Sequence, residues 1–232
     1  MSAQAILREL REKSSPEKAR ELQRFFKTAP GEYAEGDVFL GITVPEIRKI
    51  AKNHNEIDLV ELKSLISSEF HEARFCALVI LMNKFKRTQD ERERRKFYDF
   101  YIRHLNKGLI NNWDLVDVSA PTIGQVLLRE QNRQTALRQM AKSKQMWVRR
   151  TSILFTFASL RIGETRDTLA IATLLLADQH DLIQKAVGWA LREVGKIDSQ
   201  QLRAYLKKYG REMSRTSLRY AIEKFPPTER KK

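Results

Sequence analysis

The chain has 232 residues and carries 43 Lys and Arg against 29 Asp and Glu, a formal net charge of +14. This length suffices for one domain with a sizeable core or for a row of stacked helical pairs. The charge favours a polyanionic partner, nucleic acid before an anionic membrane. No run of about 18 apolar residues occurs, and the charged start lacks the apolar centre of a signal peptide, which indicates a cytoplasmic protein. The single cysteine, Cys76, excludes an internal disulfide and a thiolate metal cluster.

Two predicted helices are marked by the residues at their starts. Ser15 followed by Pro16 is typical of an N-cap with proline in the first turn, and Thr43 three residues before Glu46 is typical of a capping box. Between them, residues 29–37 contain two glycines and a proline, which interrupt any helical period. We predict the longest loop of the chain there and treat it as a candidate functional loop.

Four segments farther along resemble one another, each basic at its front and apolar behind. Aligned on positions 74, 150, 185 and 216, they are 76, 35 and 31 residues apart, and the first gap has room for another unit around Trp113. That spacing suits helical-pair repeats of about 30 to 47 residues, which stack so that one helix of each pair lines a concave face. An ordinary helical bundle would also contain similar amphipathic helices, but we favour the repeats; either way the fold class is all-α. The segments are 72–85, 148–160, 183–195 and 214–225.

Basic side chains at the starts of several such helices would converge on the concave face, where helix N-termini also attract anions. Residues 131–163 contain seven Lys and Arg and no Asp or Glu. Charge runs are usually solvated surface, so the collective excess argues more strongly than any one side chain. The sequence therefore predicts a groove for phosphates.

The sequence offers few signs of other chemistry. Gly-rich loops for nucleotides, dinucleotide fingerprints and esterase elbows are missing. The four histidines are far apart and lack the spacing of metal ligands, so we expect no metal and no cofactor.

One constellation does stand out around Trp113. Asp117 follows Trp113 by four residues, so an indole and a carboxylate would share one helix face. Trp189 follows a glycine, and Arg149 and Arg150 open a later predicted helix. Each residue also has a structural explanation, because Trp is usually core, Asp near a helix start is usually a cap, and Arg usually pairs at the surface.

Four blocks that contain these residues resemble AlkD-like DNA alkylation-repair glycosylases. They lie in the family's order and span residues 39–193, most of the chain. The resemblance implies a right-handed superhelix of HEAT-like repeats. We expect residues 1–225 to form one DNA-binding and catalytic domain and residues 226–232 a polar tail. The blocks are FLGITVPEIR (39–48), NWDLVD (112–117), WVRRTSILF (147–155) and IQKAVGWALRE (183–193).

The resemblance also assigns roles to individual residues. It implies that Trp113, Asp117 and Trp189 form the catalytic cluster and that Arg150 contacts the DNA backbone. Tyr33 is the counterpart of the family's DNA-contacting tyrosine, in a loop whose length and content differ from the best-known members. With basic residues of the repeats and blocks added, the predicted DNA contacts are Arg150, Tyr33, Thr43, Arg48, Arg74, Arg149, Lys185, Arg192 and Arg215.

The implied activity is hydrolysis of the N-glycosidic bond of cationic 3-methyladenine and 7-methylguanine in duplex DNA, by a monomer and without a pocket for a flipped base. Asp117 would stabilise the developing sugar cation and position water, while the indoles of Trp113 and Trp189 add cation-π attraction. The alternative is a non-catalytic HEAT-like scaffold that binds nucleic acid or acidic protein partners. It explains the charge and the repeats, but it does not require all these residues together. A membrane-surface binder is disfavoured, because no single helix combines a basic face with an exposed aromatic face.

Overall fold

The computed structural model describes residues 2–230, and the regular secondary structure of these residues is helical. An isolated parallel bridge between Val38 and Phe70 is the one β feature in this range. The all-α class predicted from the sequence is confirmed. Within residues 2–230 no helix combines the length and apolar character that a membrane span needs. The chain divides into two compact units, residues 1–119 and 120–232, and the boundary falls inside helix α7 (Trp113–Ile123). The expectation of a single domain over residues 1–225 stays a prediction.

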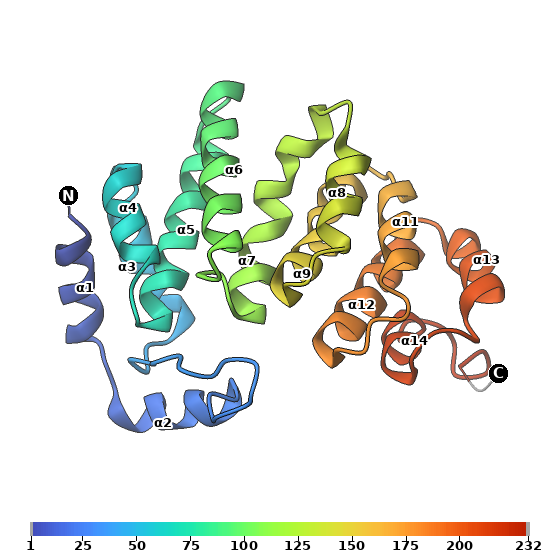
Figure 1. Ribbon diagram of the computed structural model, residues 1–232, viewed down its shortest axis with the longest axis horizontal. Coiled ribbons are helices and arrows are strands. Elements are labelled where there is room, and N and C mark those ends of the chain that lie inside the picture. The colour runs from blue at the N-terminus through green and yellow to red at the C-terminus, as the bar shows by residue number, and fades with distance from the viewer. Residues whose placement is uncertain (1, 231–232) are drawn as a thin grey trace. The chain divides into compact units, whose positions relative to one another are not determined.

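Helix α5 (His71–Arg87) is the centre of the first unit (Figure 1). Its residues from Phe75 to Met82 are all apolar and all buried, as expected for a helix surrounded by other helices. It packs against α1, α3, α4 and α6. The helices of this unit that precede α7 are α1 (Ala3–Glu12), α2 (Pro16–Phe25), α3 (Val44–Asn53), α4 (Leu59–Ile66), α5 and α6 (Glu91–Asn106).

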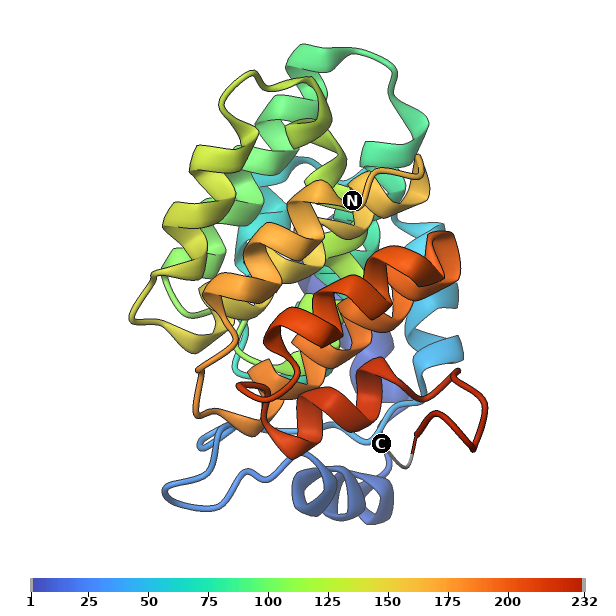
Figure 2. The same ribbon diagram turned by 90° about the vertical axis from the view of Figure 1, so that its right-hand side faces the viewer.

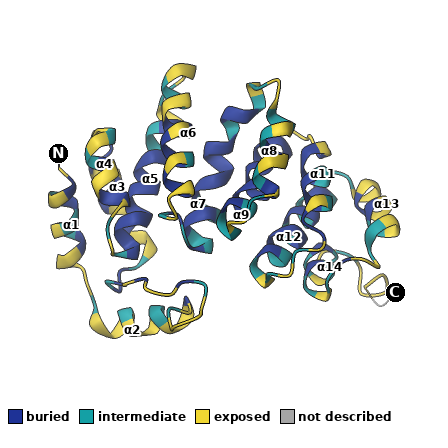
Figure 3. Cartoon of the chain, in the orientation of Figure 1, coloured by how far each residue is buried: buried dark blue, intermediate teal, exposed yellow. Residues whose placement is uncertain are grey.

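Both helix starts predicted in this unit are confirmed. The Ser15 hydroxyl accepts a hydrogen bond from the Lys18 amide at 3.4 Å ahead of α2. Ahead of α3, the amide and hydroxyl of Thr43 donate to the Glu46 carboxylate at 3.4 and 2.8 Å. The loop predicted over residues 29–37 lies inside the non-helical stretch 26–43. Helix α2 has no buried residue, as the yellow and teal colouring of Figure 3 shows, so its position depends on this stretch.

In the second unit, consecutive helices pair and the pairs stack. Helix α8 packs on α9, α11 on α12, and both α13 and α14 on α12, which also contacts α9. Figure 2 shows α13 and α14, in red tones, beside the orange α12. The predicted repeat segments that start near residues 148, 183 and 214 coincide with α9 and α10, with α12 and with α14, so the helical repeat is confirmed. The elements are the 3-10 helix η1 (Gly124–Arg129), α8 (Arg133–Ala141), α9 (Met146–Phe155), α10 (Phe157–Arg161), α11 (Arg166–Leu174), α12 (Asp181–Ile197), α13 (Ser199–Tyr209) and α14 (Arg215–Ala221).

The chain beyond α14 is anchored by Arg203 on α13. Its guanidinium donates to the Glu229 carboxylate at 2.9 Å and lies 4.6 Å from the centre of the Phe225 ring. The predicted tail, residues 226–232, is non-helical over 226–230, and its last two residues lie outside the described residues.

Helices α12 and α14 approach each other closely at Gly188. A Cβ at this position would lie 2.5 Å from both the Ser217 carbonyl oxygen and the Tyr220 Cβ. The Ser217 hydroxyl donates to the Gln184 carbonyl at 2.9 Å across the same contact. Glycine is therefore required here by the approach of a neighbouring backbone.

Gly188→Ala should lower the free energy of unfolding by about 1 to 3 kcal/mol, because α14 has to move away from α12. Urea unfolding followed by circular dichroism measures the change. The matched control is Gly195→Ala on the same helix, where the close atom is the flexible Leu202 Cδ2. Both variants gain the better helix propensity of alanine, about 1 kcal/mol, but only at Gly195 does this gain offset the contact, because the Leu202 side chain can move aside. Equal destabilisation of both variants would contradict the assignment.

Candidate active site

The amino end of α7 carries two of the predicted catalytic residues. Trp113 begins the helix, Asp117 follows one turn later, and both are half-buried. The helix places them on the same side, as their spacing predicts. The first amides of the helix are satisfied locally: Trp113 N–H donates to the Asn112 side chain and Leu115 N–H to the Asp114 carboxylate, both at 2.8 Å. The start of α7 is therefore well defined.

An aromatic cluster fixes the indole of Trp113. The Phe26 ring stacks on it at 5.3 Å and 18°, and Phe26 in turn stacks on Phe39 at 5.0 Å. Phe25, at the end of α2, meets Trp113 edge-on at 6.0 Å and is 64% exposed. This cluster was not predicted from the sequence. The signal that could have found it is the pair of phenylalanines just ahead of the predicted loop.

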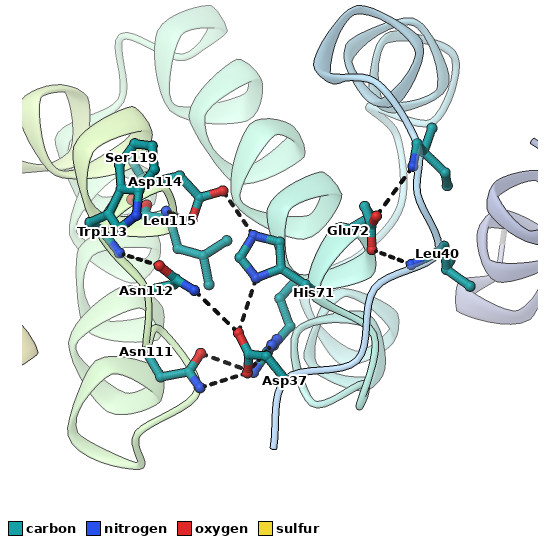
Figure 4. Close-up of polar contacts among 12 residues, drawn as sticks. Asp37, Leu40, His71, Glu72, Asn111, Asn112, Trp113, Asp114, Leu115 and Ser119 are labelled. Carbon is teal, nitrogen blue, oxygen red and sulfur yellow. Dashed lines mark hydrogen bonds and ion pairs between the residues drawn. The ribbon is translucent and has the colours of Figure 1, made fainter. Parts of the chain in front are cut away.

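The loop that carries Phe39 is held by Asp37, whose buried carboxylate lies below His71 in Figure 4. One oxygen accepts from the Arg74 guanidinium at 2.7 Å and from the Asn111 amide at 2.9 Å. The other accepts from the Asn112 amide at 3.4 Å and lies 3.1 Å from His71 Nδ1. Burial alone would raise the pKa of Asp37, but the hydrogen bond with His71 and the charge of Arg74 hold it well below its usual range.

His71 lies between two carboxylates. Its Nδ1 faces Asp37, and its Nε2 lies 2.8 Å from the Asp114 carboxylate on α7. Burial by itself disfavours the imidazolium, but the Asp114 charge and the hydrogen bonds to both acids outweigh it and raise the pKa of His71 to about 9. Despite this concentration of acids, the described residues contain no group of three or more His, Cys, Asp or Glu arranged to hold a metal ion.

A second buried acid, Glu72, secures the end of the same loop. Its carboxylate accepts from the backbone amides of Leu40, Gly41 and Ile42 at 2.9, 2.8 and 3.2 Å. Gly41 has a φ of +80°, and a Cβ there would collide with the Ser15 carbonyl oxygen. The Ser15 amide donates to the Leu40 carbonyl at 2.8 Å. The loop is thereby joined to both the start of α2 and the start of α5.

In the second unit, Trp189 and Arg150 lie on the packed helices α12 and α9. Trp189 is half-buried, meets Phe157 edge-to-face at 4.8 Å, and donates from Nε1 to Glu193 at 3.2 Å. Arg150 is buried, and its guanidinium donates to the Leu182 carbonyl in the first turn of α12. The structure therefore fixes the direction of both side chains within this unit.

Arg74, predicted as a DNA contact, has a different environment. It is 5% exposed, and its two Nη atoms donate to Asp37 and Asn111. Removing a buried guanidinium from its carboxylate would leave both charges uncompensated. We therefore assign Arg74 to the network that holds the loop and leave it out of the proposed DNA contacts.

The other predicted DNA contacts differ in how far they are already engaged. Arg48 and Arg215 are exposed, whereas Tyr33 and Thr43 are half-buried, and the Thr43 hydroxyl donates to Glu46. Three further cations are each held by an acid of their own unit. These pairs are Arg149 with Asp178 at 2.6 Å, Lys185 with Asp181 at 2.6 Å, and Arg192 with Glu223.

A family model described as "DNA alkylation repair enzyme" matches residues 6–225. The chain belongs to this family. A solved structure described as "Predicted DNA alkylation repair enzyme from Enterococcus faecalis" is similar over 93% of this chain and 98% of that chain, with a TM-score of 0.72 and 18% sequence identity. This likeness shows a shared fold. No curated protein sequence matches the chain.

Membership of the DNA alkylation repair enzymes confirms the resemblance seen in the four sequence blocks. It gives the protein a role in the repair of alkylated DNA, and a DNA partner accounts for the net charge of +14.

Asp37→Asn should lower the free energy of unfolding at pH 7 by about 3 to 5 kcal/mol, because it leaves Arg74 without its buried counterion and His71 with only one of its two acids. Since the pKa of Asp37 is depressed on folding, its contribution is present above the unfolded value of 3.8 and is lost as pH falls below it. The difference between the variant and wild type should therefore shrink at pH 3. Urea unfolding at the two pH values measures it.

The matched control is Asp99→Asn on α6, because Asp99 pairs with Arg95 at 2.9 Å and both side chains are 51% exposed. Its effect should stay within about 0.5 kcal/mol at either pH. If Asp37→Asn behaved like this control, the buried network would not be what holds the loop.

Proposed function

We propose that the protein is an alkylpurine DNA glycosylase that acts in base excision repair. It hydrolyses the N-glycosidic bond of 3-methyladenine and 7-methylguanine in duplex DNA. The observation that carries the proposal is the half-buried pair Trp113 and Asp117 at the amino end of α7, in a chain that belongs to the DNA alkylation repair enzymes.

Alkylation at N3 or N7 makes the purine a cation and weakens its bond to the sugar, so the protein has to lower the activation barrier only modestly. As that bond breaks, positive charge develops on the deoxyribose. The Asp117 carboxylate stabilises this charge and directs water to C1′, as a carboxylate does in glycoside hydrolysis. The indole of Trp113, fixed from one side by Phe26, adds cation-π attraction worth about 0.5 to 2 kcal/mol.

We assign the same kind of role to Trp189 and backbone binding to Arg150. The contacts of Trp189 with Phe157 and Glu193 restrict its indole to one orientation. The Leu182 carbonyl does the same for the Arg150 guanidinium. Orientation fixed before binding reduces the entropy lost when substrate is held.

Besides Arg150, which is buried and donates to a neutral carbonyl, duplex binding rests on exposed and exchangeable cations. Arg48 and Arg215 are exposed, and the paired Lys185, Arg149 and Arg192 can exchange a carboxylate for a phosphate. Tyr33 and Thr43 contribute from the segment ahead of α3. The enzyme acts as a monomer and needs no cofactor.

Asp117→Asn should reduce the single-turnover rate of 7-methylguanine excision by at least about 100-fold, because it removes the charge that stabilises the sugar cation but keeps the shape. Affinity for an undamaged duplex should stay within about threefold of wild type, since neutralising an acid does not weaken phosphate binding. Asp99→Asn is the control for loss of a carboxylate elsewhere. A rate within threefold of wild type would remove Asp117 from catalysis. Salt-sensitive binding without base release by the wild type would favour the scaffold instead.

Selectivity should follow the charge of the damaged base. Without a general acid to protonate the leaving base, the enzyme accelerates only bases that already leave well. Wild type should release 7-methylguanine and 3-methyladenine and leave uracil, hypoxanthine and unmodified guanine intact. Single-turnover assays on matched duplexes separate bond cleavage from product release. Efficient release of uracil or hypoxanthine would rule out the mechanism assigned to Asp117.

A further inference from the structure

His71 is a buried titratable group that the proposed chemistry does not use. It begins α5, is 3% exposed, and contacts two acids from different parts of the first unit. Asp37 belongs to the loop between α2 and α3, and Asp114 belongs to the first turn of α7, next to Trp113. The imidazole therefore joins three elements at the base of the candidate active site (Figure 4).

The geometry indicates that both ring nitrogens of His71 carry protons. A neutral imidazole has one N–H, so one of its nitrogens would direct a lone pair at a carboxylate oxygen. Here the two nitrogens lie 3.1 and 2.8 Å from carboxylate oxygens. The charged groups around the ring are the two acids and Arg74 on α5, and the elevated pKa of His71 agrees with the same assignment.

The rings that cover His71 connect it to Trp113. Phe39 stacks on the imidazole at 4.4 Å, and Phe26 lies 5.1 Å from it. Phe26 is also the ring that stacks on Trp113. A change at His71 thus reaches Trp113 by two routes, through Asp114 along the backbone and through Phe26 across the ring stack.

We propose that His71 is a positioning residue of the candidate active site: its imidazolium bridges Asp37 and Asp114 and so holds the loop 26–43 and the first turn of α7 in the arrangement that sets the indole of Trp113. This assignment rests on the proposed function where excision is the readout. The bridge itself is a property of the first unit and can be measured without DNA.

The direct test is an NMR measurement of the imidazole nitrogens in protein labelled with 15N-histidine, repeated from pH 6 to pH 10. His71 should be doubly protonated at pH 7.5 and lose a proton near pH 9. His104 is the internal comparison, because it is 1% exposed but has its Nδ1 on the Phe100 carbonyl at 2.7 Å and no acid beside it, and its burial lowers its pKa. A neutral His71 at pH 7.5 would overturn the proposal.

The variants His71→Gln and Asp114→Asn test positioning. His71→Gln should shift the indole N–H resonance of Trp113 and lower the single-turnover excision rate by about 10- to 100-fold, because small displacements of reacting groups are that damaging. Duplex affinity should change less than about threefold, since the cations proposed to bind phosphate, such as Arg48 on α3 and Lys185 on α12, lie outside the loop 26–43 and the first turn of α7. His104→Gln, equally buried, should leave both the resonance and the rate unchanged.

Asp114→Asn keeps a hydrogen-bonding group but removes the charge, so His71 should lose its proton at a lower pH. Because the pKa of His71 is raised to about 9 in the folded wild type, the stabilisation of the folded state by its imidazolium is complete below pH 6.5. This stabilisation is lost as the pH rises through 9. In the variant, the loss of excision should begin at a lower pH while circular dichroism still shows folded protein. A merely structural role would lower the rate equally at every pH, which would contradict the proposal.

The two hypotheses fail separately. If the wild type releases no alkylpurine, the proposed function is wrong, yet the His71 spectrum and the Trp113 resonance still decide whether the bridge exists. If the wild type excises and His71→Gln matches it in rate and in the Trp113 resonance, the positioning role is wrong and the glycosylase stands.

Discussion

Burial of charge in the first unit is the constraint on which the candidate site depends. Asp37, Glu72 and Arg74 are each 5% exposed or less. An ionised group withdrawn from water is destabilising by several kcal/mol unless new partners replace its hydration. The partners come from the loop, from α5 and from the residues that open α7, so the loop cannot leave α5 without stranding a charge. That requirement acts together with the buried Phe26 and Phe39 to determine where residues 26–43 lie.

The aromatic surroundings of Trp113 follow from the same constraint. Helix α2 buries none of its residues, so burial of apolar surface contributes little to its attachment to the first unit. Its start is secured by the backbone bond from Ser15 to Leu40, and its end leads into the Phe26 stack. The Glu72 carboxylate on α5 accepts hydrogen bonds from three backbone amides of the loop that follows α2. It therefore also helps to fix the end of α2, where the exposed Phe25 lies beside Trp113.

Features that depend on nearby residues could be predicted from the sequence. The starts of α2 and α3 are encoded by Ser15 and Thr43 within a single turn, and the stacked helices of the second unit repeat at a near-constant spacing. The buried network could not be predicted in this way, because Asp37 and Asn111 are separated by 74 residues and meet only through the tertiary fold. Arg74 illustrates the difference. A basic residue at the start of a repeat suggests that it lines a groove for phosphates. Its charge does not reveal whether an acid from a distant part of the chain will pair with it in the interior, as Asp37 does with Arg74.

This distinction bears on how the protein could use its positive charge. Lys185 and Asp181 form an exposed pair worth at most about 1 kcal/mol, so a phosphate can replace the carboxylate at little loss. Arg149 and Asp178 are more buried and would exchange less readily, and Arg74 would not exchange at all. Exchangeable cations attract any duplex, within a screening length of about 8 Å at physiological salt. They cannot recognise a methylated base. In the proposed enzyme, discrimination therefore comes from the lesion itself, because only a base that is already cationic leaves readily once Asp117 and the indoles stabilise the charge that develops on the sugar.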